Sequence, residues 1–180
     1  MGWVHCVPHV AWLGLGSNLG GRWGAHPNMQ VQLAIRHLNR LPGICVMASS
    51  AIYRSPPMGP ADQPDYANAV VRIESRLSAP ALLAAVKRLE QRAGRDPHGR
   101  RWGERALDID LLAVDTLVLQ QPGLTLPHPG IMERPFVLVP WAEIAPDWVL
   151  PGVGTVAECA ARLPRAVIQR WDAPEPLPTE

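Results

Sequence analysis

Several features are scarce in this 180-residue chain, and each scarcity argues against a class of protein. No run of about 18 apolar residues occurs, so we expect no membrane-spanning helix and no membrane partner. The three cysteines are odd in number and share no metal-type spacing, which favours reduced thiols in a cytoplasmic protein over a disulfide framework. The N-terminus lacks a basic segment, so no secretory signal is expected.

Charge of either sign is also in short supply. Charged residues make up 18% of the chain and the formal net charge is +1, which gives no general electrostatic case for nucleic acid or an anionic membrane. Lys87 is the only lysine and Phe136 the only phenylalanine. We attribute the excess of arginine over lysine to codon bias rather than to recognition.

The length fits one domain with a sizeable core, for which we expect residues 1–171. The remaining residues, 172–180, are rich in proline and acid and should be disordered or lie extended on the surface. We expect the protein to act as a monomer.

Hydrophobic periodicity predicts an alternation of strands and helices. The order strand–helix–strand–strand–helix–strand predicts an α+β protein of the ferredoxin-like, split β-α-β type. Its antiparallel sheet should carry helices on one face and leave the other to long loops and a site. The expected strands are 10–15, 44–55, 66–74, 107–114 and 117–119, and the expected helices are 28–41, 79–94, 135–145, interrupted near Pro140, and 155–163.

The most informative segment runs from Arg100 to Leu112. It places a basic loop in front of a strand in which Asp108 and Asp110 point to one face, because side chains on a strand alternate. Two neighbouring carboxylates repel unless a cation lies between them, and hard oxygen ligands beside arginines suit Mg²⁺ bound to a polyphosphate. The alternative is a surface ion-pair cluster of these aspartates with Arg101 and Arg105.

Four segments in order resemble the hydroxymethyl-dihydropterin pyrophosphokinase family over residues 13–151. Each is modest alone, but together and at suitable separations they are specific. The segments are Leu13-Gly-Leu-Gly-Ser-Asn18, Tyr53-Arg-Ser-Pro-Pro57 with Asp62-Gln-Pro-Asp-Tyr-Ala-Asn68, Arg101-Trp-Gly-Glu-Arg-Ala-Leu-Asp-Ile-Asp110, and Leu126-Pro-His128 with Arg134-Pro-Phe136.

The resemblance implies an enzyme of folate biosynthesis. It would transfer the diphosphoryl group of ATP to the hydroxymethyl oxygen of 6-hydroxymethyl-7,8-dihydropterin and release AMP. Asp108 and Asp110 would bind two Mg²⁺ ions, with Arg95 and Arg105 as further catalytic groups. Because such transfer needs positioning and charge neutralisation, we expect direct in-line transfer without a phospho-enzyme.

The resemblance also implies a pterin site with aromatic faces and a polar edge. For Phe136 and Tyr66 ordinary core packing is the alternative, and for the glycine-rich segment a simple turn after the first strand. Asn68 is less ordinary, because a buried amide must find partners. The implied pterin residues are Gly16, Ser17, Asn18, Ser55, Pro56, Pro57, Tyr66, Asn68, Trp102 and Phe136.

ATP would contact a second set of residues. Lys87 and Glu90 are expected to face away from the core of their helix, and a surface ion pair between them is the alternative to nucleotide contact. Leu111 could contact adenine or be plain core. The implied ATP residues are Lys87, Glu90, Trp102, Arg105, Leu111, Thr125, His128 and Arg134.

The chain departs from the family pattern at a few positions. Asp96-Pro-His98 stands where the family often has a further basic residue, and Gly123 and Pro129 replace side chains that help to hold ATP elsewhere in the family. The loop 19–27 is also rather long. These departures bear on ATP contacts and loop detail, not on the metal or pterin centres.

Two other classes of function are open to the same residues. A different Mg²⁺-dependent nucleotide phosphotransferase or hydrolase would share the aspartate pair, although the chain has no Gly-x-x-x-x-Gly-Lys-Ser/Thr loop. A ferredoxin-like RNA-binding module would need more positive charge and aromatics paired on adjacent strands.

Overall fold

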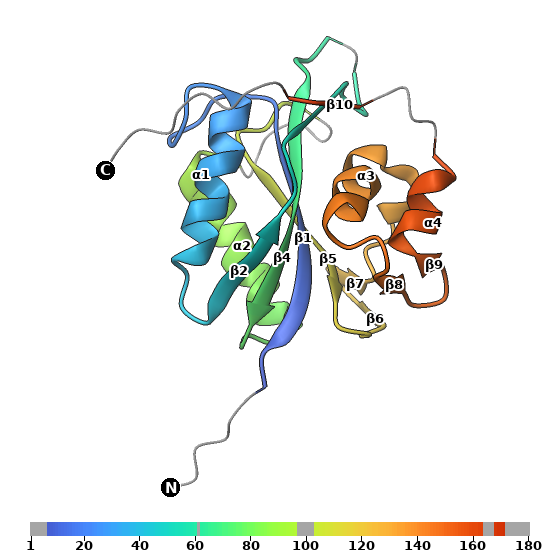
Figure 1. Ribbon diagram of the computed structural model, residues 1–180. Helices are drawn as coiled ribbons and strands as arrows, with labels where there is room; N and C mark the ends of the chain where they lie inside the picture. Colours follow the sequence, from blue (N-terminus) through green and yellow to red (C-terminus); the bar gives the residue numbers. More distant parts are fainter. Residues whose placement is uncertain (1–6, 61, 97–102, 164–167, 172–180) are drawn as a thin grey trace, which may run out of the picture.

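The protein folds around one six-stranded antiparallel sheet (Figure 1). The computed structural model describes residues 7–60, 62–96, 103–163 and 168–171. The strand order is β10–β3–β4–β1–β5, and β2 also pairs with β4. The strands are β1 (His9–Ser17), β2 (Ile44–Ser49), β3 (Tyr53–Ser55), β4 (Tyr66–Ser75), β5 (Asp108–Val114) and β10 (Gln169–Arg170).

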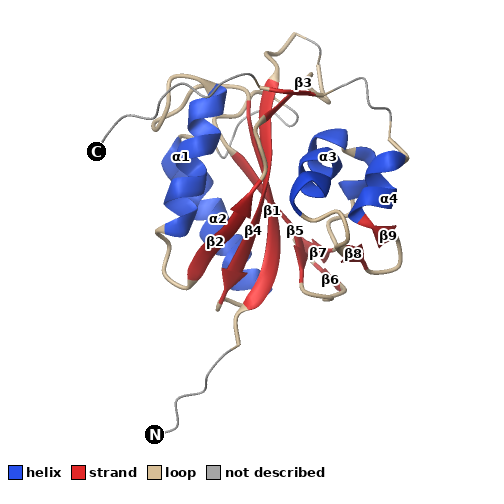
Figure 2. Cartoon of the chain, viewed as in Figure 1, coloured by secondary structure: helices blue, strands red, loops and turns tan. Residues whose placement is uncertain are grey.

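Helices cover both faces of this sheet, so the prediction of helices on one face only is wrong (Figure 2). Helices α1 (Pro27–Asn39) and α2 (Ala79–Ala93) cover one face, and α3 (Pro135–Ile144) and α4 (Val156–Ala161) cover part of the other. The remaining elements are two hairpins and a 3₁₀ turn: β6 (Leu119–Gln121) with β7 (Leu124–Leu126), β8 (Val149–Leu150) with β9 (Gly154–Thr155), and η1 (Ile131–Glu133).

Alternation along β1 explains why two separate cores form. Leu13 is fully buried in the core that α1 and α2 share with the sheet. Its neighbour Trp12 points to the opposite face, where its ring lies 5.3 Å from that of Trp141 on α3, centroid to centroid. A strand that is apolar on both faces must be covered on both, and the two last helices supply the second cover.

The local signals at the helix ends were partly correct. Ser78 occupies the N-cap position of α2, but its side chain makes no capping hydrogen bond. Gly94 ends α2 in the left-handed conformation at φ +104°, where glycine carries no steric penalty. The predicted capping box of Thr155 and Glu158 is confirmed at the start of α4. Pro140 does not interrupt α3, which continues past it with Trp141 buried.

Two predicted strands need correction. The segment 44–55 forms two strands, β2 and β3, rather than one, and the strand expected at 117–119 begins only at Leu119. Within the described ranges, no helix is long and apolar enough to cross a membrane. Trp102 and the tail 172–180 lie outside the described residues.

Candidate active site

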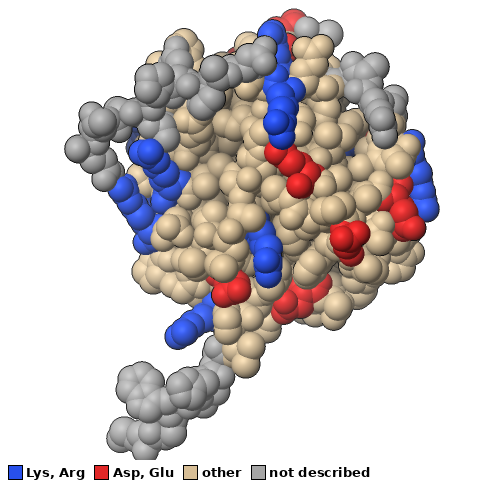
Figure 3. Space-filling model, in the orientation of Figure 1, with Lys and Arg blue, Asp and Glu red and all other residues tan. Residues whose placement is uncertain are grey.

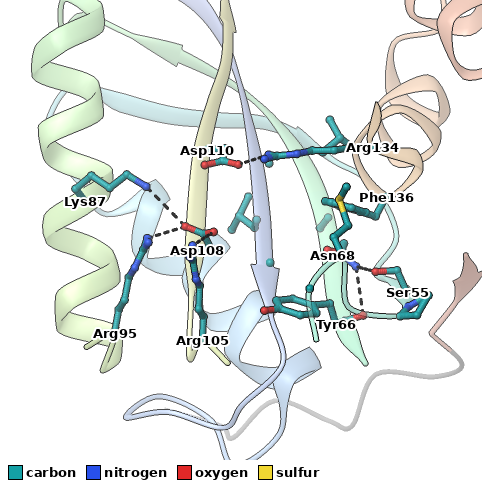
Figure 4. A pocket seen from close by; sticks show the side chains of 18 residues that line it. Ser55, Tyr66, Asn68, Lys87, Arg95, Arg105, Asp108, Asp110, Arg134 and Phe136 are labelled. Atoms are coloured by element: carbon teal, nitrogen blue, oxygen red, sulfur yellow. Dashed lines mark hydrogen bonds and ion pairs between the residues drawn. The ribbon is translucent and has the colours of Figure 1, made fainter. Parts of the chain in front are cut away.

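A pocket of about 270 Å³ opens where the sheet extends beyond α3 (Figure 4). Its floor is set by strand register: Gly16 on β1 lies opposite Asn68 on β4 and opposite Asp108 on β5. Gly14 pairs in the same way with Asp110 on β5. The carboxylates and the amide therefore flank two glycines on β1. The absence of a side chain at Gly16 leaves room above the floor, whereas the side chain of Leu112 lies close to Gly14.

Asp108 stands at the centre of a ring of cations. Its Oδ1 accepts from Arg95 Nη1 at 2.6 Å and lies 3.7 Å from Lys87 Nζ, while its Oδ2 accepts from Arg105 Nη1 at 2.6 Å. Burial alone would raise the pKa of this carboxyl, but Arg95, then Lys87 and Arg105, lower the pKa below its usual value. Asp108 is therefore an ionised carboxylate at neutral pH.

Asp110 lies on the same face of β5, two residues further on. Its Oδ2 accepts from Arg134 Nη1 at 2.7 Å, and Arg134 is the residue that precedes α3. The prediction that the two aspartates share one face is confirmed, because both line the pocket while Ile109 between them is fully buried in the other core. The ion pair of Asp108 with Arg105 that we raised as an alternative is also present.

Glu90 links α2 to the aspartate strand. Its Oε1 accepts from Lys87 Nζ and from the backbone N–H of Ile109, each at 2.7 Å, and its Oε2 accepts from Arg95. The side chain is only 2% exposed, so the prediction that Glu90 faces away from the core is wrong. Burial raises the pKa of Glu90 despite the opposing influence of Lys87. Glu90 thus holds Lys87 and Arg95, two of the three cations that face Asp108.

The end of the pocket away from Asp108 is lined by two aromatic rings and by uncharged polar side chains. Asn68 is 3% exposed, and its Nδ2 donates to Ser55 Oγ at 2.9 Å and to two backbone carbonyls. Tyr66 is half-buried and donates its hydroxyl to the carbonyl of Gly103; burial raises its pKa. Phe136 is also half-buried; it lines the pocket and packs against the core under α3. Two rings and a polar edge thus face one space (Figure 4).

Ser17 and Asn18 are placed differently from the other predicted pterin residues. Both are buried at 0% and 1% exposure and lie outside the pocket lining. Ser17 Oγ donates to the carbonyl of Leu19, and Asn18 Oδ1 accepts from the backbone N–H of Arg105 at 2.7 Å. In this conformation they shape the loop that carries Arg105 and do not face a ligand directly.

The predicted ATP residues outside the lining fall into two groups. Leu111 is 3% exposed and belongs to the core under α2. Thr125 on β7 and His128 after it are half-buried and outside the lining, and His128 is close enough to Asp110 and Arg134 to feel their charges. His128 Nδ1 accepts from the N–H of Gly130. Burial lowers the pKa of His128. Pro56 lines the pocket whereas Pro57 does not.

Sequence reasoning missed part of the lining. Gly14 could be identified only from the register of β1 with β5, which is a tertiary fact. Met58 and Gly59 belong to a proline-rich loop whose path no periodicity predicts. The missed residues are Gly14, Leu15, Met58, Gly59, Ala69 and Val137.

The donors at the charged end suit a divalent cation. Within the described ranges, no group of three or more His, Cys, Asp or Glu side chains lies together. Asp108 and Asp110 alone would leave a hard cation several coordination positions for water and substrate oxygens, which is how Mg²⁺ is usually bound with phosphates. The arginines that now pair with the aspartates are the natural partners for those phosphates.

The pocket places a cluster of arginines and aspartates beside an end bordered by two aromatic rings, an arrangement suited to an enzyme of the phosphoryl-transfer class. The chain belongs to the 7,8-dihydro-6-hydroxymethylpterin-pyrophosphokinase (HPPK) family, which it matches over residues 12–146. The family suggested by the four sequence segments is thereby confirmed.

Individual relatives agree. The chain is 42% identical over 149 residues to a 2-amino-4-hydroxy-6-hydroxymethyldihydropteridine pyrophosphokinase of Haemophilus influenzae, covering 83% of this chain and 89% of that one. It is 44% identical over 160 residues to the enzyme of that name from Methylorubrum extorquens, covering 89% and 97%.

A solved structure supports the fold. A crystal structure of Plasmodium falciparum HPPK-DHPS with pteroate superposes with a TM-score of 0.63 at 10% identity. The match covers 88% of this chain but only 44% of that longer one.

Proposed function

We propose that this protein transfers the diphosphoryl group of ATP to the hydroxymethyl group of 6-hydroxymethyl-7,8-dihydropterin, releasing AMP, as a step of folate biosynthesis. The observation that carries the proposal is the register row of Asn68, Gly16 and Asp108. It joins a ring-binding end to a phosphate-binding end across a side-chain-free floor, in a member of the HPPK family.

At the ring end, Tyr66 and Phe136 supply aromatic surface for a flat heterocycle. Asn68 and Ser55 read its donor and acceptor edge. Among the residues that the structure describes, the three side-chain hydrogen bonds of Asn68 leave from Nδ2 and none reaches Oδ1, which we propose as the acceptor for the ring. A Cβ at Gly16 would lie 3.5 Å from that oxygen. The absence of a side chain at residue 16 keeps this oxygen open to a donor on the pterin edge.

At the charged end, Arg95, Arg105 and Arg134 bind the phosphates of ATP, with Lys87 beside them. Asp108 and Asp110 hold two Mg²⁺ ions in this proposal, which neutralise the polyphosphate and align the attacking and leaving oxygens when bound. Arginines and aspartates neutralise each other while substrate is absent. Binding of the nucleotide then exchanges these internal ion pairs for contacts with phosphate and metal.

The transfer itself is direct in this proposal. The hydroxymethyl oxygen attacks the β-phosphorus, its bond to that atom forms as the bond from the bridging oxygen breaks, and the hydroxyl proton is released. AMP leaves from the opposite side. The chain's own contribution is to orient the two substrates and to neutralise charge.

We also propose that residues 1–171 form one pyrophosphokinase domain of the ferredoxin-like type, acting as a cytoplasmic monomer. The antiparallel order β2 or β3, β4, β1, β5 around α1 and α2 supports this topology.

The predicted residues outside the pocket lining have supporting roles in this proposal. Those that act near the nucleotide rather than at the pterin are Thr125, His128, Leu111 and Glu90. Trp102, Ser17, Asn18 and Pro57 are proposed to close or shape the pocket.

The RNA-binding alternative finds little support. On the face shown in Figure 3, side chains of both signs are interspersed over the surface, without a basic stripe. A strand of nucleic acid would need a continuous positive path to neutralise its phosphates.

The test is the identity of the nucleotide product. Incubation with ATP, Mg²⁺ and the reduced hydroxymethyl pterin should yield AMP and diphosphorylated pterin in equal amounts. Asp108→Asn and Asp110→Asn should lose turnover by about 100-fold or more while remaining folded, the scale of a lost electrostatic stabiliser. Asp147→Asn, in the exposed turn before β8, is the matched control and should turn over normally. ADP as product would support a γ-phosphoryl kinase instead.

A further inference from the structure

The strand that carries Ser55 is very short and is held from outside by distant parts of the chain. Strand β3 has three residues, and β4 pairs with it on one side through Tyr53 opposite Asn68 and Ser55 opposite Tyr66. Strand β10 pairs with its other side. A strand of this length contributes few ladder hydrogen bonds, so its position depends on what else contacts it.

The carboxylate of Glu143, near the end of α3, provides such a contact. Its Oε2 accepts from the hydroxyl of Tyr53 at 3.0 Å and from the backbone N–H of Ala51 at 3.1 Å, and its Oε1 accepts from Arg170 on β10. Tyr53 is 9% exposed, so its hydroxyl relies on partners within the protein, which are Glu143 and the neighbouring Arg170. One carboxylate thus ties α3 to β3, to the residues before it and to the C-terminal strand.

Further contacts bring the C-terminal strand onto β3. The backbone N–H of Trp171 donates to the carbonyl of Ile52 at 2.8 Å. The guanidinium of Arg54 lies 5.7 Å from the centre of the Trp171 ring and also pairs with Asp65 at 2.6 Å. Each such exposed contact is weak alone, but together they fix the outer edge of β3 at several points.

Glu143 also lies on the same side of α3 as a pocket residue. Phe136 precedes it by seven residues, which is two helical turns, so both project from one face of the helix. Phe136 reaches the pocket, and Glu143 reaches β3. The helix that supplies one wall of the ring end is therefore fastened to the strand that supplies Ser55 on the other wall.

We propose that Glu143, Tyr53 and strand β10 form a latch, defined by these contacts, that sets the separation of the two walls of the ring end and thereby the affinity for the pterin. Glu143 and Tyr53 are positioning residues, since neither lines the pocket. The proposal rests on the proposed function for the identity of the ligand. The effect of the latch on the stability of β3 can be measured without a ligand.

The test uses full-length Glu143→Gln, Tyr53→Phe and Arg170→Ala variants. Pterin and a non-hydrolysable ATP analogue are titrated separately by calorimetry. We expect the dissociation constant of the pterin to rise about three- to tenfold in the first two variants, the scale of one ordinary hydrogen bond, and less in the exposed third. The dissociation constant of the ATP analogue should change less, because Lys87, Arg95 and Arg105 lie on or beside α2 and β5, and only Arg134 borders α3.

Two further measurements separate the possible failures. Backbone amides of residues 51–55 should exchange with deuterium faster in these variants, whereas those of β1 should not. Glu158→Gln, which weakens the capping box of α4, is the matched control and should leave pterin binding and the exchange of β3 unchanged. Unchanged exchange at β3, or equal weakening of both ligands, overturns the latch. If wild type binds no pterin but the variants still exchange faster than wild type at β3, the proposed function is overturned and the latch stands.

Discussion

Asn68 and Asp108 lie in one register row of the sheet, on either side of Gly16. Neighbouring strands are ~4.7–4.9 Å apart, so the two side chains stand about 9–10 Å from each other across the central strand. This spacing, fixed by backbone pairing, brings a ring-reading amide and a phosphate-side carboxylate to one substrate pair. The pterin and the polyphosphate can then meet above a glycine.

The glycine floor gives the first prediction. A Cβ at Gly16 would lie 3.5 Å from Asn68 Oδ1 and 3.8 Å from Tyr66, which is ordinary contact, so Gly16→Ala should fold with little change in melting temperature. The added methyl group occupies pterin space and covers the Oδ1 acceptor of Asn68. We expect pterin affinity to fall about tenfold, or ~1.4 kcal/mol. Calorimetric titration beside a melting curve checks this, and normal pterin binding would place the ring elsewhere.

Burial of Glu90 gives the second prediction. Glu90→Gln removes the charge that holds Lys87 and Arg95, which are 39% and 23% exposed. Because water partly solvates both cations and burial already disfavours the charged form of Glu90, we expect a loss of about 1–2 kcal/mol in the free energy of unfolding, less than the ~3–5 kcal/mol of a fully buried pair. Turnover should fall with it. Denaturant unfolding measures the first effect, with Glu74→Gln on β4 as control; a stability equal to wild type would show that Glu90 is dispensable for the network.

The ionised state of Asp108 predicts a pH dependence of stability. Its folded pKa is lowered, by Arg95 most among the cations, so the unfolded chain binds the proton more readily. The stabilisation is therefore complete above the unfolded value of ~3.9 and is lost as pH falls through the folded pKa.

The comparison that isolates this effect is between wild type and Asp108→Asn in Mg²⁺-free buffer. The difference in their free energies of unfolding should be constant near neutral pH and shrink in acid. Denaturant titrations at a series of pH values measure it. A difference that grows as pH falls would mean that the folded protein favours the protonated acid.

Stacking on Phe136 gives the fourth prediction. Phe136→Ala should weaken pterin binding by ~0.5–1.5 kcal/mol or more through loss of an aromatic face. Binding of the ATP analogue should change little. Leu117→Ala, at an exposed site 40% accessible, is the control for loss of apolar surface. Equal pterin affinity in the Phe136 variant and wild type would remove this ring from the pocket.

Much of the local structure followed from the sequence because its causes are local. Alternation alone placed Asp108 and Asp110 on one face of a strand, and the box of Thr155 and Glu158 marked the start of α4. The family resemblance added the ring-end residues, of which Ser55, Tyr66, Asn68 and Phe136 line the pocket.

What the sequence could not supply depends on long-range contacts. The role of Gly14 follows from the register of β1 with β5, which are almost a hundred positions apart in the chain. Glu90 looked exposed because its helix face is polar, yet that face meets β5 through Lys87 and Ile109. The second helical layer was missed because a ferredoxin-like order accounts only for α1 and α2, and nothing local shows on which face α3 packs.

The central claim is that Asp108 and Asp110 exchange their arginines for a divalent cation when nucleotide binds. A crystal structure with Mg²⁺, the pterin and an ATP analogue carrying a methylene group between the α- and β-phosphorus tests it directly, since that bond cannot be cleaved. The account predicts both carboxylates on Mg²⁺, with Arg95, Arg105 and Arg134 turned to the phosphates. Aspartates still paired with those arginines, and phosphates bound elsewhere, would contradict it.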